Sequence, residues 1–171
     1  MIAIKNILVA TDFGPASDTA LTYGRALAES FGARLHLLHV VHSVYWAAPA
    51  YDYAGISPGV QLEIETSARR QTEAALTDDE RRTQRAVAVI VTSTSPPAAI
   101  VEYARDHDID LLVLGTHGRG PFAHLLMGSV AERVVRTAPC PVLTVHHPEH
   151  GFVFQEAPVG LAATALPQGA Q

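Results

Sequence analysis

Five short apolar runs recur along the chain, separated by longer segments of mixed polarity. Each run is too short for an amphipathic helix, and most are rich in valine, isoleucine and leucine. Near-continuous apolar runs are typical of strands covered on both faces, as in a parallel sheet. The pattern therefore predicts strands at Ile7–Ala10, Leu35–Val41, Val87–Val91, Leu111–Leu114 and Val142–Val145.

The first connection between these runs has helical spacing. Pro15 suits the first turn of a helix, and Gly32 is placed to end it. The apolar face of this helix is expected at Ala16, Ala20, Leu27 and Phe31.

Two later connections also read as helices. Ser95 is a candidate N-cap before Pro96 and Pro97, at the start of one of them. The last helical pattern ends at Pro139 and Pro141, and its apolar stripe is Phe122, Leu126, Val130 and Val134.

The second connection, residues 42–84, is the least regular. It begins with the turn-rich stretch "SVYWAAPAYDYAGISPG" and continues into a helix expected at about 60–84. The turn-rich stretch is compatible with a lid over a site or with a long surface loop, and its composition favours the loop. With this helix included, strands and helices alternate, which predicts a doubly wound α/β fold, Rossmann-like, with right-handed crossovers.

Length and composition indicate one domain. The 171 residues are enough for a single buried core, which we place in residues 1–147. Residues 148–171 contain no lysine or arginine, little periodicity and several prolines and glycines, so we expect a C-terminal tail outside that core.

Charge and cysteine content exclude several classes of function. A formal net charge of −5 argues against nucleic acid as a partner, because a phosphate backbone is held by clustered cations. Cys140 is the single cysteine, which excludes an internal disulfide. No apolar stretch reaches the roughly 18 residues that a membrane span needs, and the first residues do not read as an export signal. We therefore expect a cytoplasmic protein without a membrane partner.

The stretch "GTHGRGPFAHLLMGS", residues 115–129, carries the strongest chemical signal. It lacks the lysine of a P-loop, and it follows the wrong strand for a dinucleotide fingerprint. Its own spacing is Gly115-x2-Gly118-x9-Gly128-Ser129. If the arc after the fourth strand converges with the amides around Gly128, the two form a pocket suited to phosphate oxygens.

With this spacing, the sequence resembles the universal stress proteins in their ATP-binding branch. The resemblance covers about residues 2–146 and includes "KNILVATDF", "LHLLHVV", "IVEYARDHDIDLLVLGTHGRG" and "LLMGSVAERVVRTAPCPVLTV". It implies a five-stranded sheet of order 3-2-1-4-5, with strands 1 and 4 flanking the point where the winding reverses. Ligands of open α/β sheets bind in that crevice.

The resemblance also implies roles for particular residues. Asp12 would meet the ribose or adenine, although an aspartate there is also suited to capping the first helix, and the main chain of Val40 would pair with the adenine edge. The glycines and Ser129 would hold the phosphates, while Arg119 and His117 are either phosphate contacts or solvated loop residues. The complete expected site is Ala10, Thr11, Asp12, Val40, Leu114, Gly115, His117, Gly118, Arg119, Gly128, Ser129 and Val130.

The expected ligand is ATP, with ADP or AMP as alternatives, and Mg²⁺ or Mn²⁺ as a possible companion of the phosphates. The nine histidines do not form a convincing metal site, and His42 falls beyond the expected end of the second strand. No catalytic motif is present, which favours a regulatory or stress-response module that holds the nucleotide. A slow ATPase or nucleotidyl-transfer enzyme on the same fold is the alternative, and a nucleotide-independent interaction module fits the glycine pattern less well. The resemblance further implies a homodimer joined by the last strand, Pro141–Val145.

Overall fold

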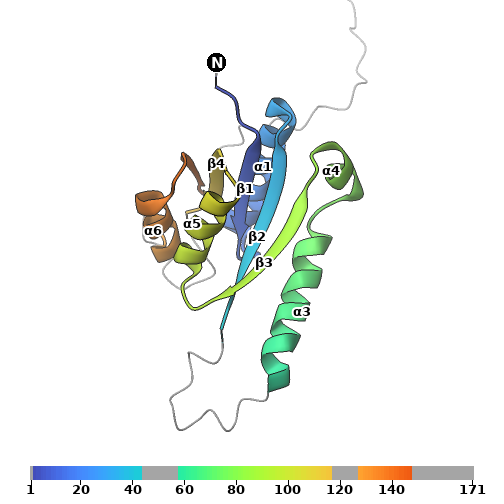
Figure 1. Ribbon diagram of the computed structural model, residues 1–171, viewed down its shortest axis with the longest axis vertical. Helices are drawn as coiled ribbons and strands as arrows, with labels where there is room; N and C mark the ends of the chain where they lie inside the picture. Colours follow the sequence, from blue (N-terminus) through green and yellow to red (C-terminus); the bar gives the residue numbers. More distant parts are fainter. Residues whose placement is uncertain (1, 44–57, 117–126, 148–171) are drawn as a thin grey trace, which may run out of the picture.

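A computed structural model describes residues 2–43, 58–116 and 127–147 (Figure 1). Strands and helices alternate along the chain as the sequence predicts. The strands are β1 (Asn6–Thr11), β2 (Arg34–His42), β3 (Val87–Ser93), β4 (Leu111–Gly115) and β5 (Val142–Val145). The helices are α1 (Pro15–Phe31), α3 (Pro58–Ala74), α4 (Asp78–Thr83), α5 (Pro96–Asp106) and α6 (Ser129–Thr137).

The five strands form one parallel sheet in the order β3-β2-β1-β4-β5. Both the fold class and the strand order are confirmed. The winding reverses between β1 and β4, which are direct neighbours with Ala10 opposite Leu114. The carboxyl ends of these two parallel strands therefore lie side by side at the same end of the sheet.

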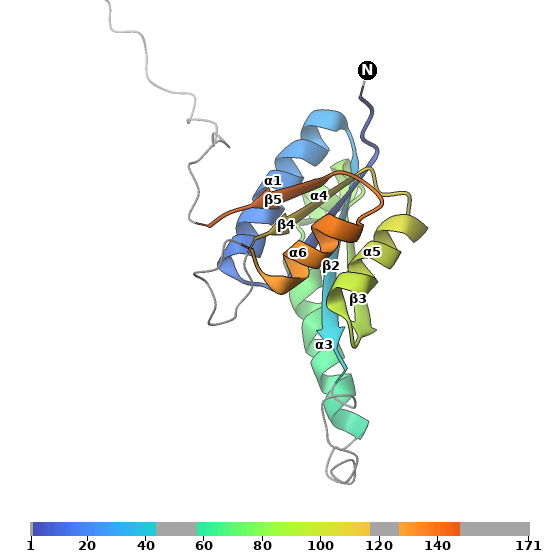
Figure 2. The ribbon, with the colours of Figure 1, turned by 90° about the vertical axis from the view of Figure 1, so that its left-hand side faces the viewer.

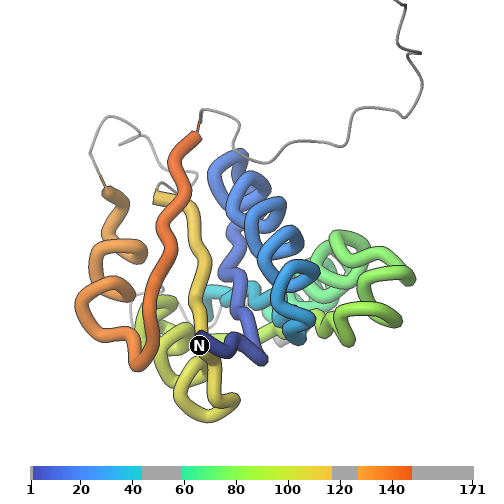
Figure 3. The backbone as a smooth tube through the Cα atoms, turned by 90° about the horizontal axis from the view of Figure 1, so that it is seen from above, coloured from blue at the N-terminus to red at the C-terminus, as the bar shows by residue number. Residues whose placement is uncertain are grey.

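Two layers of helices cover the sheet (Figures 2 and 3). Alternate residues of each strand point to opposite faces, so Ile7 and Val9 join the core under α1, while Leu8 joins the core under α5 and α6. The central strand β1 has no exposed core side chain at these positions. This double burial explains why its sequence is a continuous apolar run.

Helix α1 lies unusually close to the sheet at two glycines. A Cβ added to Gly24 would come 2.3 Å from Cγ2 of Val9, and one added to Gly115 would come 2.8 Å from the carbonyl carbon of Ala16. Glycine is therefore required at both positions by packing. The contact at Gly115 brings the start of α1 against the end of β4.

Three sequence-based expectations about elements are wrong. The helix expected at about 60–84 is two helices, because Thr77 caps α4 with its side chain and exchanges bonds with Glu80 in a capping box. Phe31 is 46% exposed and does not belong to the buried face of α1, whose last buried residue is Ala28. His42 belongs to β2, which pairs with β3 as far as Ser93.

The helix α4 is tied to α1 by one polar junction. Glu80 is buried and accepts hydrogen bonds from Arg25 and from the amide of Thr77, at 2.6 Å for the latter. Arg25 also donates to the carbonyl of Ala75. Burial alone would raise the pKa of Glu80, but the bonds from the amide and hydroxyl of Thr77 and from Arg25 hold this pKa below its usual value.

Several expectations lie outside the described residues. They concern the turn-rich stretch at 44–57, the stripe residues Phe122 and Leu126, and the tail at 148–171. In the described part of the chain, no helix combines the length and apolar character needed to cross a membrane.

Candidate functional site

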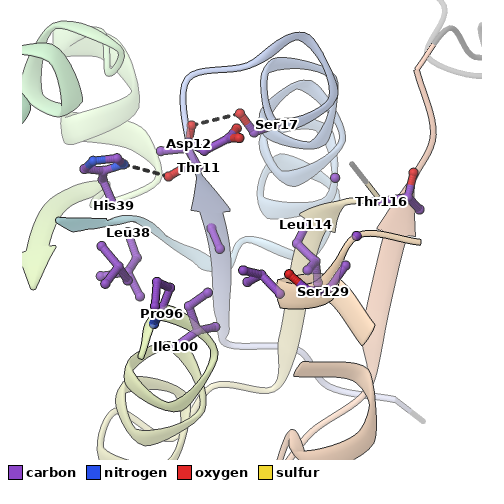
Figure 4. Close-up of a pocket in the computed structure, with 16 residues that line it drawn as sticks. Thr11, Asp12, Ser17, Leu38, His39, Pro96, Ile100, Leu114, Thr116 and Ser129 are labelled. Carbon is purple, nitrogen blue, oxygen red and sulfur yellow. Dashed lines mark hydrogen bonds between the residues drawn. The ribbon is translucent and has the colours of Figure 1, made fainter. Parts of the chain in front are cut away.

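A pocket of about 340 Å³ opens at the carboxyl ends of β1, β2 and β4, where the winding of the sheet reverses (Figure 4). This volume lies at the lower end of the range for small-molecule sites. The pocket is also bordered by the first turns of α1, α5 and α6. Its lining is Ala10, Thr11, Asp12, Ser17, Leu38, His39, Val40, Pro96, Ile100, Leu114, Gly115, Thr116, Gly128, Ser129, Val130 and Ala131.

Most of the residues expected from the sequence line this one pocket. The structure brings together Ala10, Thr11, Asp12, Val40, Leu114, Gly115, Gly128, Ser129 and Val130. Three further expected residues, His117, Gly118 and Arg119, lie outside the described residues. Segments that are more than 100 positions apart in the sequence thus border the same space.

Sequence reasoning missed seven lining residues: Ser17, Leu38, His39, Pro96, Ile100, Thr116 and Ala131. A signal existed for two of them. Pro96 and Ile100 lie in the first two turns of a helix that follows a strand, so they belong to the same end of the sheet as the expected site. Nothing in the sequence singled out His39, because its role depends on which strand lies beside it.

The turn between β1 and α1 is held by a compact set of hydrogen bonds. The Oγ1 atom of Thr11 accepts from the amide of Phe13 at 2.9 Å and donates to Oγ of Ser17 at 3.1 Å. The amide of Gly14 donates to both Ser17 Oγ and Asp12 Oδ1, each at 3.0 Å. Phe13 adopts a left-handed backbone with φ of 59°, which is unusual for a residue other than glycine.

This geometry settles how Asp12 relates to the first helix. The N-cap residue is Gly14, and Asp12 supports it by accepting the Gly14 amide. The carboxylate of Asp12 also lines the pocket. Asp12 is therefore not itself the cap of α1; it supports the cap residue and lies in the lining of the pocket.

His39 of β2 joins this turn from the neighbouring strand (Figure 4). Its Nδ1 lies 2.8 Å from the carbonyl oxygen of Thr11, and its ring lies 4.4 Å from the ring of Phe13 between centroids. Because a carbonyl oxygen only accepts, Nδ1 carries the proton in this contact. His39 stands directly opposite Thr11 in the register of the two strands.

The start of α6 supplies backbone amides to the opposite side of the pocket. Gly128 is the N-cap with an extended backbone, φ of −72° and ψ of 155°, and its amide donates to the carbonyl of Thr116 at 2.6 Å. No side chain caps the first turn of this nine-residue helix in the described structure. Its leading N–H groups and the positive end of its dipole therefore suit an anion.

The remaining wall of the pocket is apolar. Leu38, Ile100 and Leu114 are buried, and Pro96 lies beside them at the start of α5. The described lining includes one carboxylate, that of Asp12, and neither a lysine nor an arginine. The arrangement is an apolar slot with a carboxylate at one side and helix amides at the other, which suits a ligand with a flat apolar ring, hydroxyls and an anionic group.

Metal binding by the protein alone has no support in the described part. No three histidine, cysteine, aspartate or glutamate side chains gather there as a metal site would require. Burial raises the pKa of the Cys140 thiol, which keeps this cysteine in its less reactive protonated form.

Comparison with known proteins identifies the relatives of this chain. Residues 3–146 match the profile of the universal stress protein family. A universal stress protein of Thermus aquaticus, encoded in the 3′ region of a QAH/OAS sulfhydrylase gene, is 33% identical over 144 residues, which cover 82% of this chain and 98% of the relative.

Solved structures agree with this match. The universal stress protein UspA from Lactobacillus plantarum superposes with a TM-score of 0.68 at 27% identity, over 85% of this chain and 99% of that protein. A universal stress protein solved in complex with cAMP gives a TM-score of 0.54 at 28% identity, over 85% and 98% of the two chains.

Proposed function

Because this chain belongs to the universal stress protein family, we propose that it binds an adenine nucleotide in the pocket at the carboxyl ends of its strands. ATP is the expected ligand, and ADP or AMP would use the same contacts with fewer phosphates. The observation that carries this proposal is the placement of the uncapped first turn of α6 opposite Asp12, across one apolar slot. The cAMP complex of a related structure supports the same class of ligand.

In this proposal, each part of the nucleotide meets a different wall of the pocket. The phosphates lie at the amides of Ser129 and Val130, where the hydroxyl of Ser129 adds a donor. Adenine packs on Leu38, Ile100 and Leu114, with its polar edge at the main chain of Val40. The Asp12 carboxylate accepts hydrogen bonds from the ribose hydroxyls, for which its oxygens are chemically suited.

Three residues beyond the described part belong to the same proposal. Gly118 would let the chain approach the phosphates closely, and Arg119 and His117 would add contacts to them. A divalent cation, Mg²⁺ or Mn²⁺, would arrive with the phosphates, whose oxygens supply its main ligands. The described lining offers amides, hydroxyls and apolar groups, which suit retention of the nucleotide, and the function that follows is a nucleotide-dependent regulatory or stress-response module in the cytoplasm.

A pair of substitutions at Ser129 tests the phosphate end. Ser129 is the first helical residue after an extended Gly128, a position that accepts proline without disturbing the helix. Ser129→Ala removes the hydroxyl, and Ser129→Pro removes both the hydroxyl and the amide N–H. We expect ATP affinity to fall about tenfold in the first variant and at least about a hundredfold in the second, since each hydrogen bond to a charged group contributes about 1.5 kcal/mol or more.

Isothermal titration with ATP measures both affinities, and thermal unfolding checks that the fold is retained. Equal affinity in the wild type and in a folded Ser129→Pro variant would mean that the phosphates do not meet this helix. Failure of the wild type to bind ATP, ADP or AMP at millimolar concentration would defeat the proposal as a whole.

The proposal includes a homodimer joined along β5. This strand is at the edge of the sheet, and Val142, Leu143 and Thr144 are only partly buried. An apolar edge strand is a liability for a monomer, and pairing with its twin about a two-fold axis would cover it. Light scattering of the purified chain should return the mass of two chains, and the mass of one chain would contradict this arrangement.

A further inference from the structure

The side chain of His39 makes a contact that no backbone ladder requires. It reaches from β2 to the last carbonyl of β1, at Thr11, and donates a hydrogen bond of 2.8 Å. The two residues are direct partners in the strand register, which places the imidazole level with the end of β1. The His39 side chain therefore supplies a hydrogen-bond donor to the carbonyl at which the neighbouring strand ends.

That carbonyl belongs to the peptide unit that leads into Asp12. A peptide unit is planar, so holding the Thr11 carbonyl also sets the direction in which the Asp12 amide and Cα leave the strand. The next residue, Phe13, has a left-handed backbone, and its ring packs against the imidazole of His39. His39 thus contacts the turn at two points that lie on either side of Asp12.

We propose that His39 is a positioning residue, whose Nδ1–H bond to Thr11 orients the Asp12 carboxylate toward the ribose hydroxyls of the bound nucleotide. This inference rests on the proposed nucleotide function and extends it to a residue outside the phosphate-binding pattern. His39 acts through the turn, and Asp12 makes the contact. The donor at the δ position is the essential group, and the aromatic contact with Phe13 is secondary.

Two substitutions separate the donor from the ring. His39→Asn keeps an N–H donor close to the position of Nδ1 and loses the ring, whereas His39→Phe keeps a ring beside Phe13 and loses the donor. If the turn needs only an aromatic side chain at position 39, His39→Phe should behave like the wild type. If the turn needs the hydrogen bond, His39→Asn should behave like the wild type.

The first measurement needs no nucleotide. Amide hydrogen exchange of Phe13 and Gly14 reports the order of the turn, because these amides donate to Thr11 Oγ1 and Asp12 Oδ1. We expect His39→Phe to speed their exchange at least about tenfold relative to the wild type, and His39→Asn to change it by less than about threefold. The amide of Leu112, which donates to the Pro141 carbonyl in the sheet, serves as the reference for global stability.

The second measurement is ATP affinity by isothermal titration in five proteins: the wild type, His39→Phe, His39→Asn, Asp12→Ala and the double variant of Asp12→Ala with His39→Phe. His39→Phe should weaken binding about tenfold in the wild-type background, and His39→Asn should restore it to within about threefold. In an Asp12→Ala background, His39→Phe should have almost no further effect, because the residue through which it acts is gone.

The outcomes distinguish this inference from the function on which it rests. Unchanged exchange of Phe13 and Gly14 in His39→Phe, or an equal loss of ATP affinity with and without Asp12, would overturn the role of His39 while nucleotide binding stands. Faster exchange of the turn in a protein whose wild type binds no adenine nucleotide would overturn both the proposed function and the orientation toward ribose. Asparagine performing as poorly as phenylalanine in a folded protein would also overturn the inference.

Discussion

Two histidines on the same strand, three residues apart, belong to regions of opposite character. His36 lies near the start of β2 and is 4% exposed, with Nδ1 at 2.9 Å from the hydroxyl of Tyr103. His39 lies near the other end, half-buried at the pocket, and its Nδ1 donates to a backbone carbonyl. An odd spacing on a strand puts their side chains on opposite faces of the sheet.

The amino ends of the strands are closed by groups within the protein. One oxygen of Asp110 accepts the amides of Lys5 and Asn6, at 2.7 and 2.9 Å, and His36 packs with Tyr103 and His107 between β2 and α5. At the carboxyl ends, the described first turn of α6 has no side-chain cap and faces the pocket instead. The first region stabilises the fold, and the second has polar groups left for a ligand.

This comparison predicts that most substitutions change either stability or nucleotide affinity. Gly115→Ala should change both quantities, because Gly115 lines the pocket and also packs on α1. It is also the substitution with the largest expected effect. The new Cβ would lie 2.8 to 2.9 Å from backbone and Cβ atoms of Ala16, so the start of α1 must move. We expect a loss of about 3 kcal/mol in the free energy of unfolding and at least about a tenfold loss of ATP affinity.

Gly32→Ala is the matched glycine control for this prediction. Gly32 ends α1 with φ of 61°, and nothing lies within 4 Å of the position of an added Cβ. Alanine there should cost about 1 kcal/mol through its backbone conformation alone and leave ATP affinity unchanged. Urea unfolding measures the stability of both variants, and isothermal titration measures their ATP affinity. A Gly115→Ala protein with wild-type affinity would show that stability and nucleotide binding are independent even at this contact.

The next largest effect concerns pH and the buried region. Burial, with a contribution from the nearby Arg34 and then His107, lowers the pKa of His36 from 6.5 to about 4. The unfolded chain therefore binds a proton more readily than the folded one between these two values. Stability contributed by neutral His36 is complete above pH 6.5 and is lost as the pH falls toward 4, by about 2 kcal/mol between pH 7.5 and pH 5.

Urea unfolding at these two pH values measures the loss, and the His36→Leu variant is the control in which it should shrink. The window lies above the range in which Glu80, whose pKa is lowered, takes up its proton. A pH dependence that is the same in wild type and His36→Leu would assign the effect to other groups. ATP affinity per folded molecule should not respond to this substitution.

The smallest expected effect concerns Glu132, in the first turn of α6. Glu132 pairs with Arg136 at 2.8 Å on the surface, and such an exposed pair contributes less than about 0.5 kcal/mol. Its negative charge lies on the helix whose start faces the pocket, so Glu132→Gln should raise ATP affinity about twofold at low salt, with no gain at high salt. Glu73→Gln, at the end of α3, is the charge-matched control, and an equal gain there would indicate a general effect of net charge.

The sequence predicts most elements because their signals are local. The five apolar runs, Pro15 at the start of α1 and Gly32 at its end all coincide with the structure to within one or two residues. The expected single helix at 60–84 fails at Thr77 because a capping box, Thr77 with Glu80, outweighs continuous helical periodicity. Both residues of that capping box can be read from the sequence.

By itself, the sequence determines the order of strands and helices along the chain, and it indicates a phosphate-binding site at Gly128 and Ser129. Both inferences rest on patterns among residues that are close in the sequence. Only the tertiary structure decides that His39 reaches the Thr11 carbonyl and that Gly115 must be small for Ala16. These contacts depend on strand register and on how closely α1 approaches the sheet. Register and helix packing are set by the whole core at once, and no spacing within a single segment specifies them.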